Sequence, residues 1–163
     1  KGPIEFLVGS LRMVGAKVNK KYAYKMGDWI GDLGQSLYNP PSVFGWDEGL
    51  PWVSTSGMLA RAEVAHRVAD ARDKKAPLKY KPDKLMGKKG DWQDMDAPAV
   101  VDRILSRLAV EEPAASTRTA LEDYVRADSM GLPQTITVDK DFIDRKVRGL
   151  IALIMSSPEF QLS

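Results

Sequence analysis

The stretch YNPPSVFGWDEGLPW, residues 38–52, decides the fold because it separates two strongly helical patterns. Prolines and glycines recur through it, and both residue types end helices. We therefore predict a loop between two helices. An aromatic-rich loop is either folded against the body of the protein or built to hold a ligand. We interpret Trp46 and Trp52 as rings that pack the loop against the adjoining helices, and stacking on a sugar or another flat ligand is the alternative.

Outside this loop, apolar residues recur at helical spacing along most of the chain. The spacing predicts helices over residues 3–15, 22–37, 54–72, 96–108, 113–131 and 139–156. The only β-like run, QTITV at residues 134–138, is too short and isolated to define a sheet. The predicted fold class is therefore all-α. We expect an irregular bundle of about six helices in a single domain, residues 1–163, with a Pro/Gly/Trp-rich connecting loop and a long basic loop.

Three glycines, Gly27, Gly31 and Gly34, lie beside the apolar stripe of the second predicted helix. Glycine inside a helix costs about 1 kcal/mol relative to alanine, so this spacing calls for a reason. We predict that another helix approaches closely there. A backbone surface exposed to a ligand is the alternative.

Residues 74–89 form a long basic stretch that Pro77, Pro82 and Gly87 interrupt. We expect an irregular, mobile loop with solvated lysines. Contact with phosphates, an anionic membrane surface or an acidic partner is the alternative. The net charge of the chain is only +2, so we do not expect nucleic acid as a partner. No apolar run reaches the roughly 20 residues that a transmembrane helix needs.

Few residues of the chain suit catalysis or metal binding. There is no cysteine and one histidine, His66, which we expect to be packed and hydrogen-bonded on an alanine-rich helix face. The acids at 91, 94 and 96 lack the pattern of a calcium loop and are interpreted as helix caps. Asp47 and Glu48 flank Trp46 but are interpreted as turn residues rather than catalytic acids. We therefore predict neither a metal site nor a cofactor.

Four segments together resemble the C-terminal part of the bacterial domain-of-unknown-function family 1800. They are KGPIEFLVGSLRMVG at 1–15, LGQSLYNPPSVFGW at 33–46, GLPWVSTSGMLARAEVAHRVA at 49–69 and LIMSSPEFQLS at 153–163. Residues 74–132 carry no recognised motif. Asp47 and Glu48 depart from the resemblance, because a proline or glycine turn is usual after the Gly-Trp pair.

The resemblance carries expectations about the whole protein. Members of this family are longer and often look exported, so it implies a C-terminal fragment from a periplasmic or extracellular protein. The chain begins Lys1-Gly2-Pro3 without an initiator methionine, which fits a fragment. The expected partners are the missing N-terminal region and another envelope protein or polymer. The resemblance supplies no reaction and no catalytic residue.

Three hypotheses for function follow. The first is a helical scaffold or interaction domain without its own catalytic site. The second is that the region contributes one wall of an enzyme active site in the full-length protein. The third is binding of a carbohydrate or cell-envelope polymer through Trp46 and Trp52. The candidate ligand-binding residues are Glu5, Arg12, Gln35, Trp46, Trp52 and Arg61.

Overall fold

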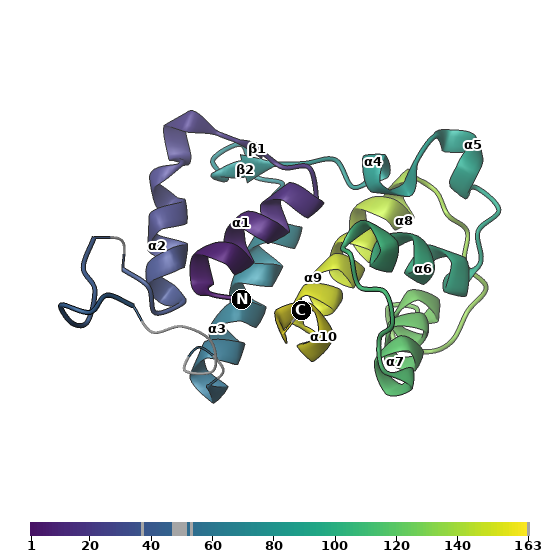
Figure 1. The fold of residues 1–163 in the computed structure, drawn as a ribbon. Coiled ribbons are helices and arrows are strands. Elements are labelled where there is room, and N and C mark those ends of the chain that lie inside the picture. The colour runs from purple at the N-terminus through teal and green to yellow at the C-terminus, as the bar shows by residue number, and fades with distance from the viewer. Residues whose placement is uncertain (37, 47–51, 53, 163) are drawn as a thin grey trace.

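Six helices of nine or more residues dominate the computed structural model, which describes residues 1–36, 38–46, 52 and 54–162 (Figure 1). They are α1 (Pro3–Met13), α2 (Tyr24–Asp32), α3 (Thr55–Ala69), α6 (Ala97–Arg107), α7 (Ala115–Arg126) and α9 (Arg148–Ser156). Shorter turns connect them: η1 (Lys20–Tyr22), α4 (Asp83–Met86), α5 (Lys89–Trp92), α8 (Lys140–Phe142), η3 (Ile143–Val147) and α10 (Pro158–Leu162). The predicted all-α fold is confirmed.

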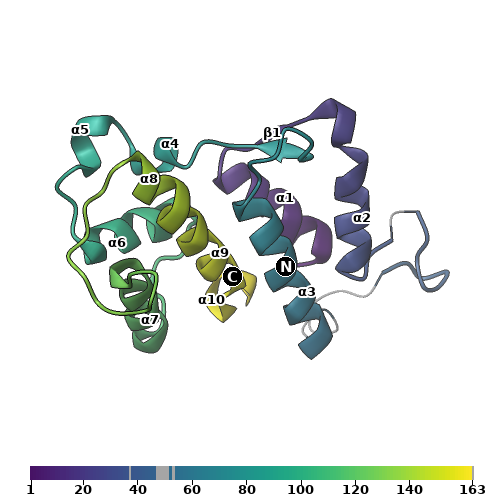
Figure 2. The same ribbon diagram turned by 180° about the vertical axis from the view of Figure 1, so that it is seen from behind.

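The centre of the molecule is the pairing of α3 with α9, which form the most extensive contact between any two elements in the described part of the chain. Helices α1 and α2 lie on the outer side of α3, and α6 and α7 lie beyond α9 (Figures 1 and 2). Val64 and Val68 of α3 and Ile151 of α9 are at most 1% exposed. Small residues such as Ala65 let the two helices approach closely, so both halves of the bundle share one core.

The last long helical stretch contains a π-helical turn. Asp139 caps it by accepting a hydrogen bond from the Phe142 N–H at 2.7 Å, which confirms the predicted start. The segment η3 then widens to a π-helix before α9 continues. Beyond it, α9 packs so tightly on α7 that a Cβ at Gly149 would lie 1.9 Å from the Tyr124 hydroxyl oxygen. π-Helical turns are rare and are frequent at functional sites.

Two short strands join segments that are far apart in the sequence. Strand β1 (Lys17–Val18) pairs antiparallel with β2 (Leu78–Lys79), and the register places Lys17 opposite Lys79. The basic stretch at residues 74–89 is therefore a long connection, as expected, but it is not irregular throughout. Leu78 and Met86 are fully buried and anchor it to the core. The QTITV run forms no strand, since its neighbourhood contributes only the isolated bridge between Ala127 and Pro133.

Helix α2 differs from its prediction in length and in packing. It ends at Asp32, and Gly34 follows with φ of 92°, the left-handed conformation that terminates many helices. No atom lies within 4 Å of a Cβ placed at Gly27 or Gly31. The predicted close approach of another helix is therefore wrong at these two positions, and the buried residues of this segment are Ile30 and Leu33.

Within the same described residues, none of the helices combines the length and the apolar composition required to cross a membrane.

Candidate functional site

Arg61 joins the two ends of the chain, which lie close together in Figure 1. It projects from α3 and is only 3% exposed. Its guanidinium donates to the carbonyl oxygen of Lys1 at 2.6 Å and to that of Gln161 at 3.4 Å. The guanidinium carbon lies 5.5 Å from the centroid of the Phe6 ring. Burial lowers the pKa of Arg61, and no carboxylate pairs with it among the described residues. The Arg61 side chain is therefore paired with backbone carbonyl oxygens and, among the described residues, not with an acidic side chain.

Glu5 and Gln35 stabilise the first turn of α1, beside the same chain end. The Glu5 carboxylate accepts a hydrogen bond from the Gly2 N–H at 2.7 Å, which satisfies a donor that the helix leaves unpaired. The Gln35 side-chain carbonyl accepts from the Ile4 N–H at 3.3 Å and thereby ties the end of α2 to α1. Both contacts satisfy backbone donors at the start of α1, and each uses one polar atom of its side chain.

The C-terminal SSPEF segment completes this assembly. The Phe160 ring meets Phe6 edge-on with 5.9 Å between centroids. The Lys1 ammonium donates to the Phe160 carbonyl oxygen at 2.8 Å and lies 4.2 Å from the centroid of the same ring. Burial is the main reason that the pKa of Lys1 is lowered. We call Lys1, Glu5, Gln35, Arg61 and Phe160 the end clasp. It brings together three of the six predicted site residues.

Arg12 does not belong to the end clasp. It lies on the exposed side of α1 near its C-terminus. Within the described part of the chain, its side chain forms neither an ion pair nor a hydrogen bond. Of the candidate ligand-binding residues on the first and third predicted helices, Arg12 is therefore the one that takes no part in the described contacts between the chain ends.

Trp46 and Trp52 form the base of the connecting loop. Their ring centroids lie 6.0 Å apart at an interplanar angle of 39°, and both residues are half-buried. A Cβ placed at Gly34 would lie 3.6 Å from the Trp52 ring, so the pair sits over the end of α2. This arrangement agrees with the packing interpretation for the two rings. Asp47 and Glu48, the acids that flank Trp46, lie outside the described residues.

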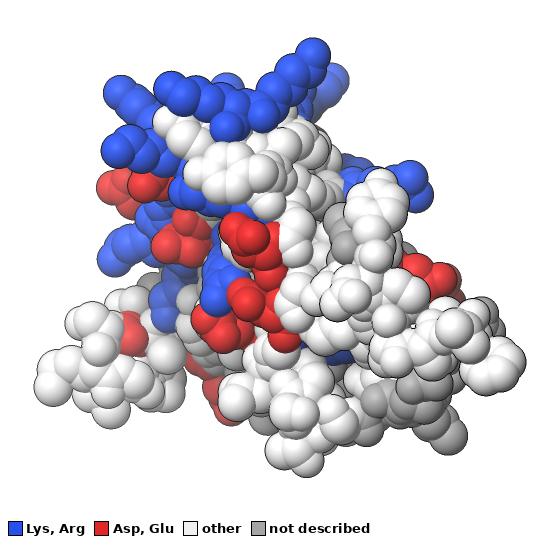
Figure 3. All heavy atoms as spheres, turned by 90° about the vertical axis from the view of Figure 1, so that its left-hand side faces the viewer, with Lys and Arg blue, Asp and Glu red and all other residues white. Residues whose placement is uncertain are grey.

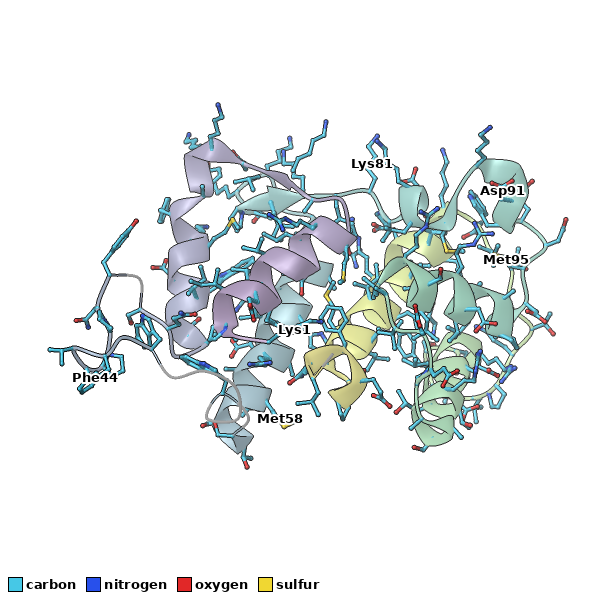
Figure 4. All side chains as sticks on the ribbon, in the orientation of Figure 1. Lys1, Phe44, Met58, Lys81, Asp91 and Met95 are labelled. Carbon is cyan, nitrogen blue, oxygen red and sulfur yellow. The ribbon has the colours of Figure 1, made fainter. Side chains whose placement is uncertain are left out.

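The tip of the loop, in contrast, projects away from the body. Figure 4 shows Phe44 far from the helices, at the outer end of the loop. Tyr38, Val43 and Phe44 are 101%, 97% and 96% exposed. A turn shapes the tip, because the Gly45 N–H donates to the Ser42 carbonyl oxygen at 3.1 Å. We call residues 38–45 the apolar tip.

His66 and the aspartates have simple structural roles or none. The expected packed histidine is wrong, since His66 is exposed on α3 and its side chain makes no hydrogen bond within the described residues. Asp96 caps α6 by accepting from the Ala99 N–H at 2.9 Å, as predicted. Asp91 accepts from the Lys88 N–H at 3.0 Å at the start of α5. No group of three or more acidic or histidine side chains in the described ranges could hold a metal ion.

The sequence reasoning missed a basic pocket beside the β1–β2 pair. Lys and Arg gather in Figure 3 along the top edge, where Figure 1 places β1, β2 and the start of α2. A hollow of about 550 Å³ opens between the β1–β2 pair, α4 and the start of α9. Its basic lining residues are Lys17, Arg72, Lys79, Lys81, Lys84 and Arg148. Two basic runs, residues 17–21 and residues 74–89, are visible in the sequence. Only the pairing of β1 with β2 brings lysines from both runs to one place.

Comparison with known proteins gives one match. The description "Protein of unknown function (DUF1800)" matches residues 1–162, which includes the region at 74–132 where no motif was recognised. No curated protein and no solved structure matches the chain.

Proposed function

The chain belongs to the DUF1800 family of proteins of unknown function, and we propose that it is a helical interaction domain that presents its apolar tip to a partner protein. The observation that carries this proposal is the near-complete exposure of Tyr38, Val43 and Phe44. Burying a valine or phenylalanine side chain is worth about 1.5–3 kcal/mol. Burial of these side chains in an apolar groove of a partner would provide that free energy, which is absent while the side chains are exposed.

The shape of the tip supports binding rather than chance exposure. The Phe44 N–H donates to the Ser42 hydroxyl oxygen at 3.2 Å, in addition to the backbone bond that closes the turn. Gly45 has φ of 91°, a conformation that few other residues adopt, and this allows the tight turn. A preformed tip loses less conformational freedom on binding, so the complex with the partner is more stable.

The contacts of the end clasp support a scaffold role for the residues beneath the loop. Glu5, Gln35 and Arg61 each engage a backbone group near a chain end. Each of these bonds stabilises the fold and needs no ligand. These contacts therefore favour the scaffold over one wall of an active site.

A photo-crosslinking residue tests the interaction. We would place p-benzoylphenylalanine at Phe44 and, as a matched control, at Met130, which is 82% exposed on a different loop. Both variants would be expressed in a bacterium that carries the natural protein. We expect one discrete cross-linked protein from position 44 and none from position 130. Val43→Ser should remove the product and leave the free energy of unfolding unchanged to about 0.5 kcal/mol, because the side chain is exposed. Equal products from both positions would contradict the proposal.

A second candidate function rests on the two tryptophans. Half-exposed indole rings can stack on sugars, and Trp46 and Trp52 lie in one loop. Tryptophan fluorescence measured against an oligosaccharide panel tests this possibility. A saturable change that Trp46→Leu removes would favour a carbohydrate or cell-envelope polymer as the ligand. Either ligand fits the periplasmic or extracellular setting that we propose from the family resemblance.

A further inference from the structure

We propose that the basic pocket between β1, β2, α4 and α9 binds a small ligand that carries two or more adjacent phosphate groups. The pocket lies apart from the apolar tip, and the proposal does not depend on the tip's function. Its volume of about 550 Å³ lies in the range of small-molecule sites. Figure 4 shows Lys81 at the upper edge of the molecule, between β2 and α4.

The charge of the lining is strongly unbalanced. Six lining residues are basic and one, Asp144, is acidic. Four of the basic residues are the lysines Lys17, Lys79, Lys81 and Lys84, and all four are exposed. Within the described part of the chain, none of these four side chains forms an ion pair or a hydrogen bond. Their ammonium groups are therefore available to a ligand, and a concave wall of one sign concentrates anions.

The strand register adds evidence of a different kind. Lys17 and Lys79 are direct partners across the antiparallel pair. Side chains of directly opposed residues lie on the same face, and like charges in that arrangement destabilise a sheet. Burial of Leu78 holds the two strands together despite the repulsion. A bound anion between the two ammonium groups would turn this unfavourable contact into a favourable one.

The two arginines of the pocket are already engaged. Arg148 donates to the Asp144 carboxylate and to the Ala69 carbonyl oxygen, at 2.8 and 2.9 Å. Arg72 donates to the other oxygen of Asp144 at 2.8 Å. Tyr80 lies beneath them, with its ring centroid 4.7 Å from the Arg148 guanidinium carbon. Arg148 and Tyr80 are buried, the side chains of Arg72 and Asp144 are nearly half exposed, and the four lysines are exposed.

The four lysines, which form no ion pair within the described residues, suit a ligand with several negative charges, such as adjacent phosphate groups. The two-pronged guanidinium of arginine matches planar carboxylates and phosphates alike, whereas lysine acts as a point charge that commonly binds phosphate oxygens. Here each guanidinium already donates two hydrogen bonds, whereas the four ammonium groups donate none within the described residues. Several lysines around one hollow match a compact ligand with several negative charges, such as a diphosphate, better than a single monoanion.

Calorimetric titration with inorganic pyrophosphate tests the proposal. The test variant is Lys17→Gln with Lys79→Gln. The matched control is Lys20→Gln with Lys74→Gln, which removes the same charge from two exposed lysines outside the pocket lining. We expect one site per chain, affinity that falls with salt, and roughly tenfold weaker binding in the test variant only. Citrate, which has a similar charge on carboxylates, should bind more weakly than pyrophosphate.

The melting temperature separates loss of binding from loss of fold. Without ligand, the test variant should melt at the same or a higher temperature than the unmodified chain, because a like-charge pair has been removed. Pyrophosphate should raise the melting temperature of the unmodified chain and of the control variant, but not that of the test variant. No binding to the unmodified chain, equal weakening in both variants, or tighter binding of citrate would each overturn the proposal.

Discussion

Replacing Arg61 with alanine should cost the domain about 3 kcal/mol of folding free energy. A hydrogen bond from a charged donor contributes about 1.5–3 kcal/mol, and the 2.6 Å bond to the Lys1 carbonyl oxygen is of this kind. Truncation also removes the stem that packs over Phe6. Removing the charged guanidinium also removes the free-energy cost of burying it, and this offsets part of the loss. For a domain of this size, each kcal/mol lowers the melting temperature by about 2–4 °C, so the expected decrease is roughly 6–12 °C.

Two further variants separate the contribution of the Arg61 hydrogen bonds from that of its packed stem. Arg61→Met keeps an apolar stem but has no donor, so we expect it to lose about half as much stability as alanine. Arg67→Ala, six residues along α3, is the matched control. Arg67 forms two ion pairs, with Asp32 at 2.6 Å and Glu63 at 2.5 Å, but its side chain is 34% exposed. The i,i+4 pair contributes about 0.3–0.5 kcal/mol and the other exposed pair about 0.2–1 kcal/mol, so this control should lose about 0.5–1.5 kcal/mol, a decrease of about 1–6 °C.

Urea unfolding followed by circular dichroism measures all four proteins. The expected order of stability is unmodified chain, Arg67→Ala, Arg61→Met and Arg61→Ala. If Arg61→Ala unfolds like Arg67→Ala, the end clasp contributes little and the reasoning from buried carbonyl contacts is refuted. A large loss for Arg61→Ala would also explain any phenotype of that variant through folding, without a ligand.

Three other outcomes follow from the structure. Gly149→Ala should destabilise the domain by about 1–3 kcal/mol in thermal unfolding, because its Cβ would overlap the Tyr124 hydroxyl and force that ring to move. Gly31→Ala, in open space on α2, should instead stabilise it by up to about 1 kcal/mol, and a loss there would contradict the open space around Gly31 in the structure. Hydrogen bonds from its own backbone N–H and from that of Ala114 lower the pKa of Glu159. The stability that Glu159 adds is therefore present above the unfolded pKa of 4.5 and lost as pH falls through the folded value, so the deficit of Glu159→Gln should shrink in urea unfolding at pH 3.

Local features of the fold followed well from the sequence. Ser54 accepts from the Gly57 N–H at 3.0 Å and starts α3, where the predicted helix over residues 54–72 begins. Asp96 and Asp139 start α6 and α8 in the same way. Such caps join residues three apart, so a short stretch of sequence contains all the information. The apolar spacing worked for the same reason, because it records which face of a helix is buried.

The candidate site was predicted only in part. Glu5, Gln35 and Arg61 do lie together, and the motifs of the resemblance pointed to them. Their contacts with the backbone were not foreseeable, because the Arg61 bond to Gln161 joins residues 100 positions apart. The prediction that His66 is packed was wrong for a related reason. An alanine-rich helix carries more than one small-residue face, and only the position of α9 decides which of them is covered.

The sequence by itself determined the all-α class, the positions of the long helices and the family, because these depend on residues that are near one another or on recognisable strings. The tertiary structure alone decided that residues 17–18 and 78–79 would pair. That pairing concentrates lysines from two separate basic runs around one hollow. It also decided that the loop at 38–52 has a half-buried tryptophan base and an exposed apolar tip. Burial depends on which distant surfaces meet, and no local pattern contains that information.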